Sequence, residues 1–114
     1  MGDLSANFSR SEFRCPHCGV VDVSPRLVEV LQRARTLVGR PLTIVSGYRC
    51  PVQNRRVGGI RASQHRKGRA ADVPGDYAPV ETWIKAGAIG VGVRNGRVIH
   101  VDVTPYRRPF VFLD

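Results

Sequence analysis

The stretch SQHRKGRAADV, from Ser63 to Val73, carries the pattern on which the fold and the chemistry of this chain depend. It places His65 seven residues before Asp72, with glycine and alanine between them. Small residues let the backbone turn tightly, and residues 71–73 are expected to form a strand that delivers the carboxylate. An imidazole and a carboxylate brought together in this way suit a divalent metal, and zinc accepts both ligand types. The stretch therefore predicts two ligands of a zinc site.

A third ligand is expected from RVIHVDV, Arg97 to Val103, whose alternating apolar residues are typical of a strand. Residues two apart share a face of a strand, so this segment should have one face toward a cleft and one toward the core. The expected faces are Val98, His100 and Asp102 toward the cleft, and Ile99, Val101 and Val103 toward the core. We predict a zinc ion held by His65, Asp72 and His100. A fourth position open to water is the arrangement of catalytic rather than structural zinc.

Several motifs together resemble one known superfamily, that of the zinc D,D-peptidases and L-alanyl-D-glutamate peptidases. It includes D-alanyl-D-alanine carboxypeptidases, phage endolysin peptidases and the zinc fold of hedgehog signalling domains. The similar stretches are SGYRCPVQN (Ser46 to Asn54), VGG (Val57 to Gly59), SQHRKGRAADV and the late HVDV. The superfamily pattern S-x-H-x-x-G-x-A-x-D, with a distant histidine in a strand, is matched by Ser63, His65, Gly68, Ala70, Asp72 and His100. The likeness extends from FSRSEF near the start to about Val103.

The resemblance implies an α+β fold, in which a small antiparallel sheet has helices packed on one face. It implies peptidoglycan stem peptides as substrate, cut at a bond that involves a D-amino acid by a D,D-carboxypeptidase or an L-Ala-D-Glu-type endopeptidase. It also assigns a substrate contact to Arg49, whose guanidinium could grip a carboxylate or a developing oxyanion. We predict Tyr48 and Ser63 as further substrate-binding residues, and Ser63 could instead orient a metal ligand.

A zinc-activated water also needs a general base, and the sequence gives no obvious one. Many relatives have an acidic residue or a second histidine two or three positions before the last zinc ligand, where this chain has Arg97 and Val98. Our candidate base is Asp102, on the same strand face as His100. Its competing role is to hold an imidazole in the correct tautomer. The sequence leaves both roles open.

The composition predicts one globular domain, residues 1–114, with residues 1–8 flexible. Eighteen basic residues against nine acidic ones give a net charge of +9, which favours polyanionic partners. The basic residues are scattered along the chain, which disfavours a nucleic-acid reader with one clustered face. Anionic cell-wall polymers are the partners that fit better, and we expect a monomer.

The chain contains no apolar run close to the ~20 residues that a membrane span requires. Its start lacks the basic region followed by an apolar segment that marks a signal peptide. We therefore expect a protein made in the cytoplasm that acts on the cell wall. A phage lysis or virion-associated peptidase suits these features, and a host wall-remodelling enzyme is the alternative.

Three cysteines, Cys15, Cys18 and Cys50, form an odd set that excludes a complete disulfide framework within one chain. The spacing Cys15-Pro-His-Cys18 can grip a metal in a tight knuckle, and His17 or Cys50 could complete a second site. A structural zinc usually needs four ligands, however, and only one CxxC half is present. The sequence favours partly buried thiols, or a bridge from Cys50, over a second zinc.

Local patterns predict most of the remaining elements. Ser9 to Phe13 has the signature of a capped helical turn, and Ser24 to Val38 that of a helix begun by a Ser-Pro pair and ended by Gly39. Asn95-Gly96 between two alternating runs indicates a hairpin. Further expected elements are a strand at Leu42 to Ser46, a short helix and glycine turn at 54–59, a helix at Pro79 to Ala86, and an edge strand in the tail. The expected inward residues of the two longer helices are Leu27, Val28, Leu31, Ala34, Leu37 and Val38, then Val80, Trp83 and Ile84.

Two other classes of function are also compatible with the sequence. One is a zinc-bearing binding module of the same fold without turnover, because the acidic residue expected before His100 is missing. The other is a basic nucleic-acid-binding protein that uses Cys15-Pro-His-Cys18 as a knuckle. Zinc binding without hydrolysis would identify the first, and salt-sensitive DNA binding that survives His65→Ala would identify the second.

Overall fold

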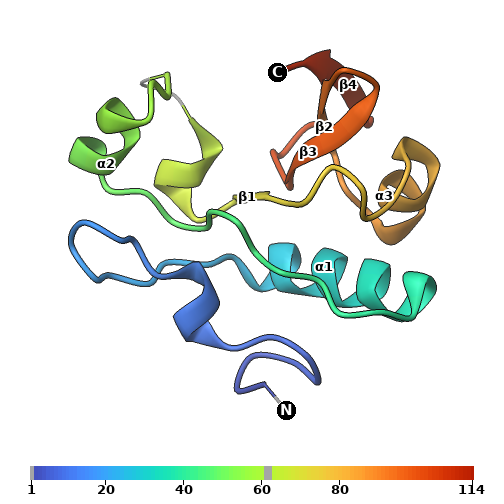
Figure 1. Ribbon diagram of the computed structural model, residues 1–114, viewed down its shortest axis with the longest axis horizontal. Coiled ribbons are helices and arrows are strands. Elements are labelled where there is room, and N and C mark those ends of the chain that lie inside the picture. The colour runs from blue at the N-terminus through green and yellow to red at the C-terminus, as the bar shows by residue number, and fades with distance from the viewer. Residues whose placement is uncertain (1, 61–62) are drawn as a thin grey trace.

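The computed structural model describes residues 2–60 and 63–114. The helices and strands form an α+β arrangement, as the sequence predicts (Figure 1). In chain order the elements are η1 (Arg10–Phe13), α1 (Pro25–Val38), α2 (Pro51–Arg56), η2 (Gln64–Lys67), β1 (Ala70–Asp72), α3 (Val80–Ala86), β2 (Gly90–Arg94), β3 (Arg97–Asp102) and β4 (Phe110–Leu113). None of the helices in these residues has the length and apolar character that crossing a membrane requires.

The four strands form one sheet in the order β1-β3-β2-β4. The predicted hairpin joins β2 to β3, and its turn residues Asn95 (φ 53°) and Gly96 (φ 75°) both have the positive φ of a primed turn. The expected edge strand is β4, but it runs parallel to β2, so the sheet is mixed rather than purely antiparallel. The reason is the path of the chain. Gly90 pairs with Asp102 on one side and with Phe110 on the other, so residues 103–109 cross the start of β2.

The core lies between α1, α3 and one face of the sheet (Figure 1). It contains Leu27, Val30, Leu31 and Ala34 from α1, Trp83 and Ala86 from α3, and Val91, Val98 and Val101 from the sheet. Two residues predicted to face inward are exposed, Leu37 by 49% and Ile84 by 37%. Leu37 lies at the edge of the apolar stripe in the last turn of α1. Trp83 and Ala86 set the inward side of α3, which turns Ile84 outward.

A β-bulge in β3 changes which residues face the core and which lie on the side of His100. Gly92 pairs with His100 and Val93 pairs with Val98, so Ile99 is the extra residue. The bulge breaks the strict alternation: Val98 is 2% exposed in the core, and Ile99 lines a pocket with His100. The predicted faces of Val98 and Ile99 are therefore wrong, whereas that of His100 toward the pocket is confirmed.

Two loops also differ from the predictions. The stretch predicted as a strand at Leu42 to Ser46 is irregular, and only Ser46 makes an isolated bridge, to Asp72. The start of the chain, expected to be flexible, packs onto the body: Phe8 is buried in the core and its carbonyl accepts a hydrogen bond from the N–H of Leu4. A buried aromatic ring provides the apolar contact that anchors this segment.

Candidate metal centre

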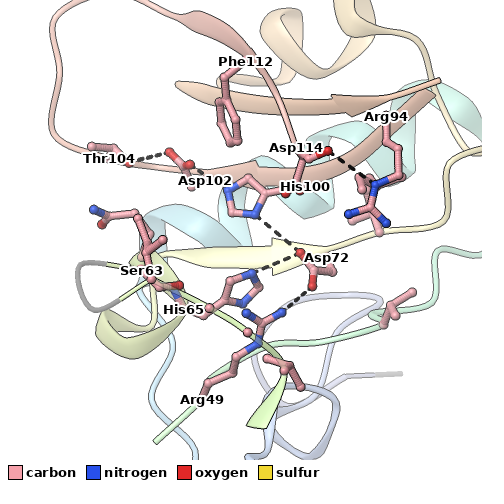
Figure 2. Close-up of a pocket in the computed structure, with 18 of the residues that line it drawn as sticks. Arg49, Ser63, His65, Asp72, Arg94, His100, Asp102, Thr104, Phe112 and Asp114 are labelled. Carbon is pink, nitrogen blue, oxygen red and sulfur yellow. Dashed lines mark hydrogen bonds and ion pairs between the residues drawn. The ribbon is translucent and has the colours of Figure 1, made fainter. Parts of the chain in front are cut away.

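Three side chains from three elements meet beside the sheet (Figure 2). His65 comes from η2, Asp72 from the end of β1 and His100 from β3, where it is paired across the strands with Asp72. His65 Nε2 lies 3.1 Å and His100 Nδ1 lies 3.4 Å from the same oxygen, Asp72 Oδ1. One ligand atom of each residue lies within 4.8 Å of the other two. The structure thus brings together the three residues that the sequence singled out as metal ligands.

The turn that carries His65 is shaped by the residues on either side of it. Ser63 begins η2, and its hydroxyl oxygen accepts a hydrogen bond from the backbone N–H of His65. Gly68 ends η2 at φ 67°, the left-handed conformation that glycine adopts without steric cost. The chain then enters β1 at once, so the seven-residue spacing of the motif returns Asp72 to His65.

Each imidazole is fixed by a hydrogen bond on its far side. His65 Nδ1 lies 2.8 Å from the carbonyl of Gly47, and His100 Nε2 lies 2.8 Å from Asp102 Oδ2. A carbonyl and a carboxylate accept protons, so these ring nitrogens are the ones that donate. The other ring nitrogens, His65 Nε2 and His100 Nδ1, face Asp72 Oδ1. With both of these nitrogens deprotonated, the three atoms would offer a cation three acceptors, and such far-side partners are typical of metal-binding histidines.

The pKa values of the metal-free centre show how strongly it attracts positive charge. Burial alone would raise the pKa of Asp72, but hydrogen bonds from His100 and His65 and the charge of Arg49 hold it well below its usual range. Burial alone would lower the pKa of His100, but hydrogen bonds to Asp102 and Asp72 raise it to about 9. Without a metal, a proton on His100 therefore supplies the positive charge.

Arg49 forms an ion pair with Oδ2, the second carboxylate oxygen of Asp72. Its Nη2 lies 2.6 Å from Asp72 Oδ2, and its Nε donates a hydrogen bond to the hydroxyl of Ser46. The ion pair is largely buried, and it leaves Oδ1 to the two histidines. Arg49 also lines the pocket, so the predicted contact with a substrate is compatible with its place beside the metal ligand.

Asp102 lies behind His100 and is 3% exposed. One of its oxygens faces His100, and the other accepts hydrogen bonds from the N–H of Gly90 and from the N–H and hydroxyl of Thr104. Burial raises its pKa, but the hydrogen bonds from His100 and Thr104 lower it to a greater extent. Both oxygens of this carboxylate thus have partners within the protein, and Asp102 is also one of the residues that line the cavity.

Two glycines in β2 make room for this arrangement. A Cβ on Gly90 would collide with the carboxylate of Asp102, and a Cβ on Gly92 would lie 2.9 Å from the Cβ of His100. Glycine inside a strand often marks such a close approach. The Gly-Val-Gly alternation was the sequence signal for this support, and the sequence reasoning missed it.

The centre opens into a cavity of about 940 Å³, within the size range of ligand pockets. Ser63 lines it, as predicted for a substrate-binding residue, and so do Arg94, Phe112 and Asp114, which the sequence did not single out. Those three come from the hairpin and the tail, whose position depends on the long-range pairing of β4. Tyr48 was predicted here but lies on another side, near Cys18 and Asp22; burial, followed by these charges, raises its pKa.

The three cysteines form a second cluster, and their thiols are unbridged in the part of the chain that the structure describes. The sulfur atoms of Cys15, Cys18 and Cys50 lie within 4.8 Å of one another. Cys50, far away in sequence, is therefore close to both members of the CxxC pair.

Fold and site together define a candidate metal centre of two histidines and one aspartate, open to a pocket, on an α+β scaffold. This agrees with a comparison of the sequence with protein families: the chain belongs to the peptidase M15 family, whose model matches residues 6–102. No curated protein matches the chain. The family consists of zinc-dependent peptidases, which makes the chain a member of a metallopeptidase family and is consistent with His65, Asp72 and His100 as ligands.

Proposed function

We propose that this protein is a zinc peptidase that hydrolyses stem peptides of bacterial peptidoglycan, with His65, Asp72 and His100 as the zinc ligands. The observation that carries the proposal is the convergence of two imidazole nitrogens, His65 Nε2 and His100 Nδ1, on Asp72 Oδ1 at the edge of a cavity. Three protein ligands and an open side are typical of catalytic zinc. A zinc ion bound there would polarise the scissile carbonyl and lower the pKa of a bound water.

The residues around the ligands supply orientation. Gly47 and Asp102 keep His65 and His100 in the tautomers that point Nε2 and Nδ1 at the metal position. Arg49 keeps Asp72 turned with Oδ1 forward. Partners of this kind typically raise metal affinity or activity by 10–100-fold.

Of the two roles left open for Asp102, its surroundings support orientation of His100. A general base must be within reach of the water it deprotonates, and Asp102 is enclosed by His100, Gly90 and Thr104. Asp114 also lines the cavity and is exposed. We take its carboxylate as the candidate general base.

The lining of the cavity supports a peptide substrate that carries carboxylates. Arg49 and Arg94 supply two guanidinium groups, and exposed apolar side chains, among them Ile60 and Tyr106, supply surface for aliphatic groups. Guanidinium groups bind carboxylates through paired hydrogen bonds. The net charge of +9 would hold the protein on an anionic cell wall, as a monomer, with an attraction that added salt weakens.

The test is hydrolysis of purified peptidoglycan, measured by the release of new amine ends and by mass spectrometry of the muropeptides. A chelator should abolish the release and zinc should restore it. His65→Ala should lose turnover, and Arg26→Ala, which changes an exposed residue outside the cavity, should retain it. Product masses would identify the bond and separate a carboxypeptidase from an endopeptidase. Zinc binding by a folded protein without any hydrolysis would contradict the proposal and favour the binding module.

A further inference from the structure

A second set of potential metal ligands includes Cys50, the residue that directly follows Arg49. It consists of three thiols within 4.8 Å of one another, and His17 lies beside them with its Nδ1 3.4 Å from the sulfur of Cys50. In a tetrahedral zinc site with Zn–S bonds of about 2.3 Å, neighbouring ligand atoms lie roughly 3.5–4 Å apart. The three sulfurs lie within 4.8 Å of one another, and the imidazole of His17 is 3.4 Å from one of them, so a cation would draw the side chains of this cluster together.

The backbone around the CxxC pair has the shape of a metal-binding knuckle. The N–H of Cys15 donates to the carbonyl of Val20, and the N–H of Gly19 donates to the carbonyl of Cys15. Gly19 has φ 77°, so the chain reverses directly after Cys18 and presents both thiols on one side. This local turn supplies two ligands and His17 between them.

Backbone N–H groups point at two of the sulfur atoms. The N–H of Cys50 lies 3.5 Å from the sulfur of Cys15, and the N–H of Gln53 lies 3.4 Å from the sulfur of Cys50. Such donors stabilise thiolates, and the thiolate is the form of cysteine that binds metals. Cys15 and Cys50 are buried, whereas Cys18 and His17 are exposed, so an ion can enter from the solvent side.

We propose that Cys15, Cys18, Cys50 and His17 bind a structural zinc ion, separate from the zinc of the cavity. Three sulfurs and one imidazole are a common ligand set for structural zinc, and four protein ligands leave no position for a substrate. The proposal does not depend on the peptidase function. It replaces the expectation of idle or bridged thiols, because the fold supplies the third sulfur that a lone CxxC lacks.

The position of this site gives it a structural role. It ties the segment after η1 to the residue that directly follows Arg49. The same two segments are joined by a hydrogen bond from the N–H of Tyr48 to the carbonyl of Phe13. Gly47, whose carbonyl orients His65, packs against the backbone of Phe13. A zinc ion here would therefore hold the loop that supports two ligands of the catalytic centre.

The test is to purify the protein under reducing conditions, measure its zinc content by mass spectrometry, and record the absorption spectrum after exchange with cobalt. The wild-type protein should bind two equivalents of metal, with a thiolate-to-cobalt charge-transfer band. His65→Ala combined with His100→Ala should lose one equivalent and keep the full band. Cys18→Ser, at an exposed position that does not disturb the core, should lose the band and the other equivalent. His17→Ala should weaken that site by about a hundredfold, since four ligands share the binding free energy.

Val20→Ser is the matched control, because it places a serine in the same loop on an exposed side chain outside the cluster. It should keep both equivalents and the band. The proposal would be overturned by a folded His65→Ala/His100→Ala protein that binds no zinc. A cobalt spectrum without a thiolate band, or a native disulfide between two of the three cysteines, would also overturn it.

Discussion

The two clusters of potential ligands differ in the number of donors that the protein supplies to a metal. The His65–Asp72–His100 centre has three converging donors and faces a cavity of about 940 Å³. The cysteine cluster has three sulfurs with a histidine beside them, at the junction of two chain segments. As proposed, a metal in the first would keep a coordination position for a reacting group, and a metal in the second would have all four positions filled by protein. The number of donors, rather than their burial, separates a site for chemistry from a site for stability.

The clusters also differ in what keeps their donors in place. The histidine centre is held from behind by a backbone carbonyl and by two charged side chains, a carboxylate and a guanidinium. The sulfur cluster is held by the backbone N–H groups of Cys50 and Gln53. A side chain can therefore be changed behind the first centre without breaking the backbone, which makes its support open to mutation.

The largest expected effect is that changes in the two clusters alter different properties. A change in the histidine centre should lower activity, and a change in the cysteine cluster should lower stability. His100→Ala should lower kcat/KM by at least about 10³-fold, because a catalytic zinc contributes several kcal/mol of transition-state stabilisation. Cys18→Ser should leave kcat/KM within about threefold at low temperature but lower Tm by roughly 10 °C or more, because structural zinc binding is coupled to folding. Peptidoglycan hydrolysis and thermal unfolding of the same preparations measure both effects. Equal losses of activity in the two variants would show that the clusters act as one unit.

The next effect concerns the support of His100. Asp102→Asn should lower zinc affinity or turnover by 10–100-fold, because the amide holds the ring less firmly and can present the wrong hydrogen-bonding group. Asp114→Asn removes a carboxylate that lines the same cavity but bonds to none of the ligands. If Asp114 is the base, its variant should keep full zinc affinity and lose turnover. Zinc titration and initial rates distinguish the two.

The opposite pattern would reverse these roles. Full zinc affinity with lost turnover in Asp102→Asn, together with normal rates in Asp114→Asn, would make Asp102 the base in spite of its enclosure.

The sequence predicted elements whose signals are local. The Ser24-Pro25 start and Gly39 end of α1, and the Asn95-Gly96 turn, are defined by a few adjacent residues, and the structure confirms them. The direction of β4 could not be predicted, because it depends on how residues 103–109 cross the sheet. The bulge at Ile99 was also missed, since an unbroken alternation of apolar residues gives no sign of an extra residue.

The site was predictable to the extent that its residues share a motif. The spacing of His65 and Asp72 within one turn was enough to bring them together, and the strand pattern directed His100 to the same side. The supporting carbonyl of Gly47 could not be found, because a backbone oxygen carries no residue signature. The proximity of Cys50 to Cys15 is a tertiary contact, 35 residues apart in sequence, that no local pattern encodes.

The smallest effect expected is a pH dependence of the metal-free protein that comes from His100. Its folded pKa of about 9 lies above the ordinary value of 6.5. The folded state therefore keeps a proton that the unfolded state releases first. The resulting stabilisation is complete below pH 6.5 and is lost as the pH rises through 9. In the presence of a chelator, the midpoint of urea unfolding should fall over this range.

The thiols titrate in the same range, so the comparison must be made between variants. Burial alone would raise the pKa of Cys15, but backbone hydrogen bonds lower it to about 7, which gives a pH dependence of the opposite sign. His100→Gln keeps the thiols and removes the imidazole, so the difference between its curve and that of the wild type isolates His100. The difference should shrink from pH 6.5 to 9. With zinc bound, the difference between the two curves should not show this decrease, because coordination keeps His100 of the wild type neutral at every pH of that range. Parallel curves of stability against pH for the wild type and His100→Gln, both without metal, would show that the Asp72–His100–Asp102 network does not hold a proton. The contrast in charge that we draw between this centre and the cysteine cluster would then be wrong.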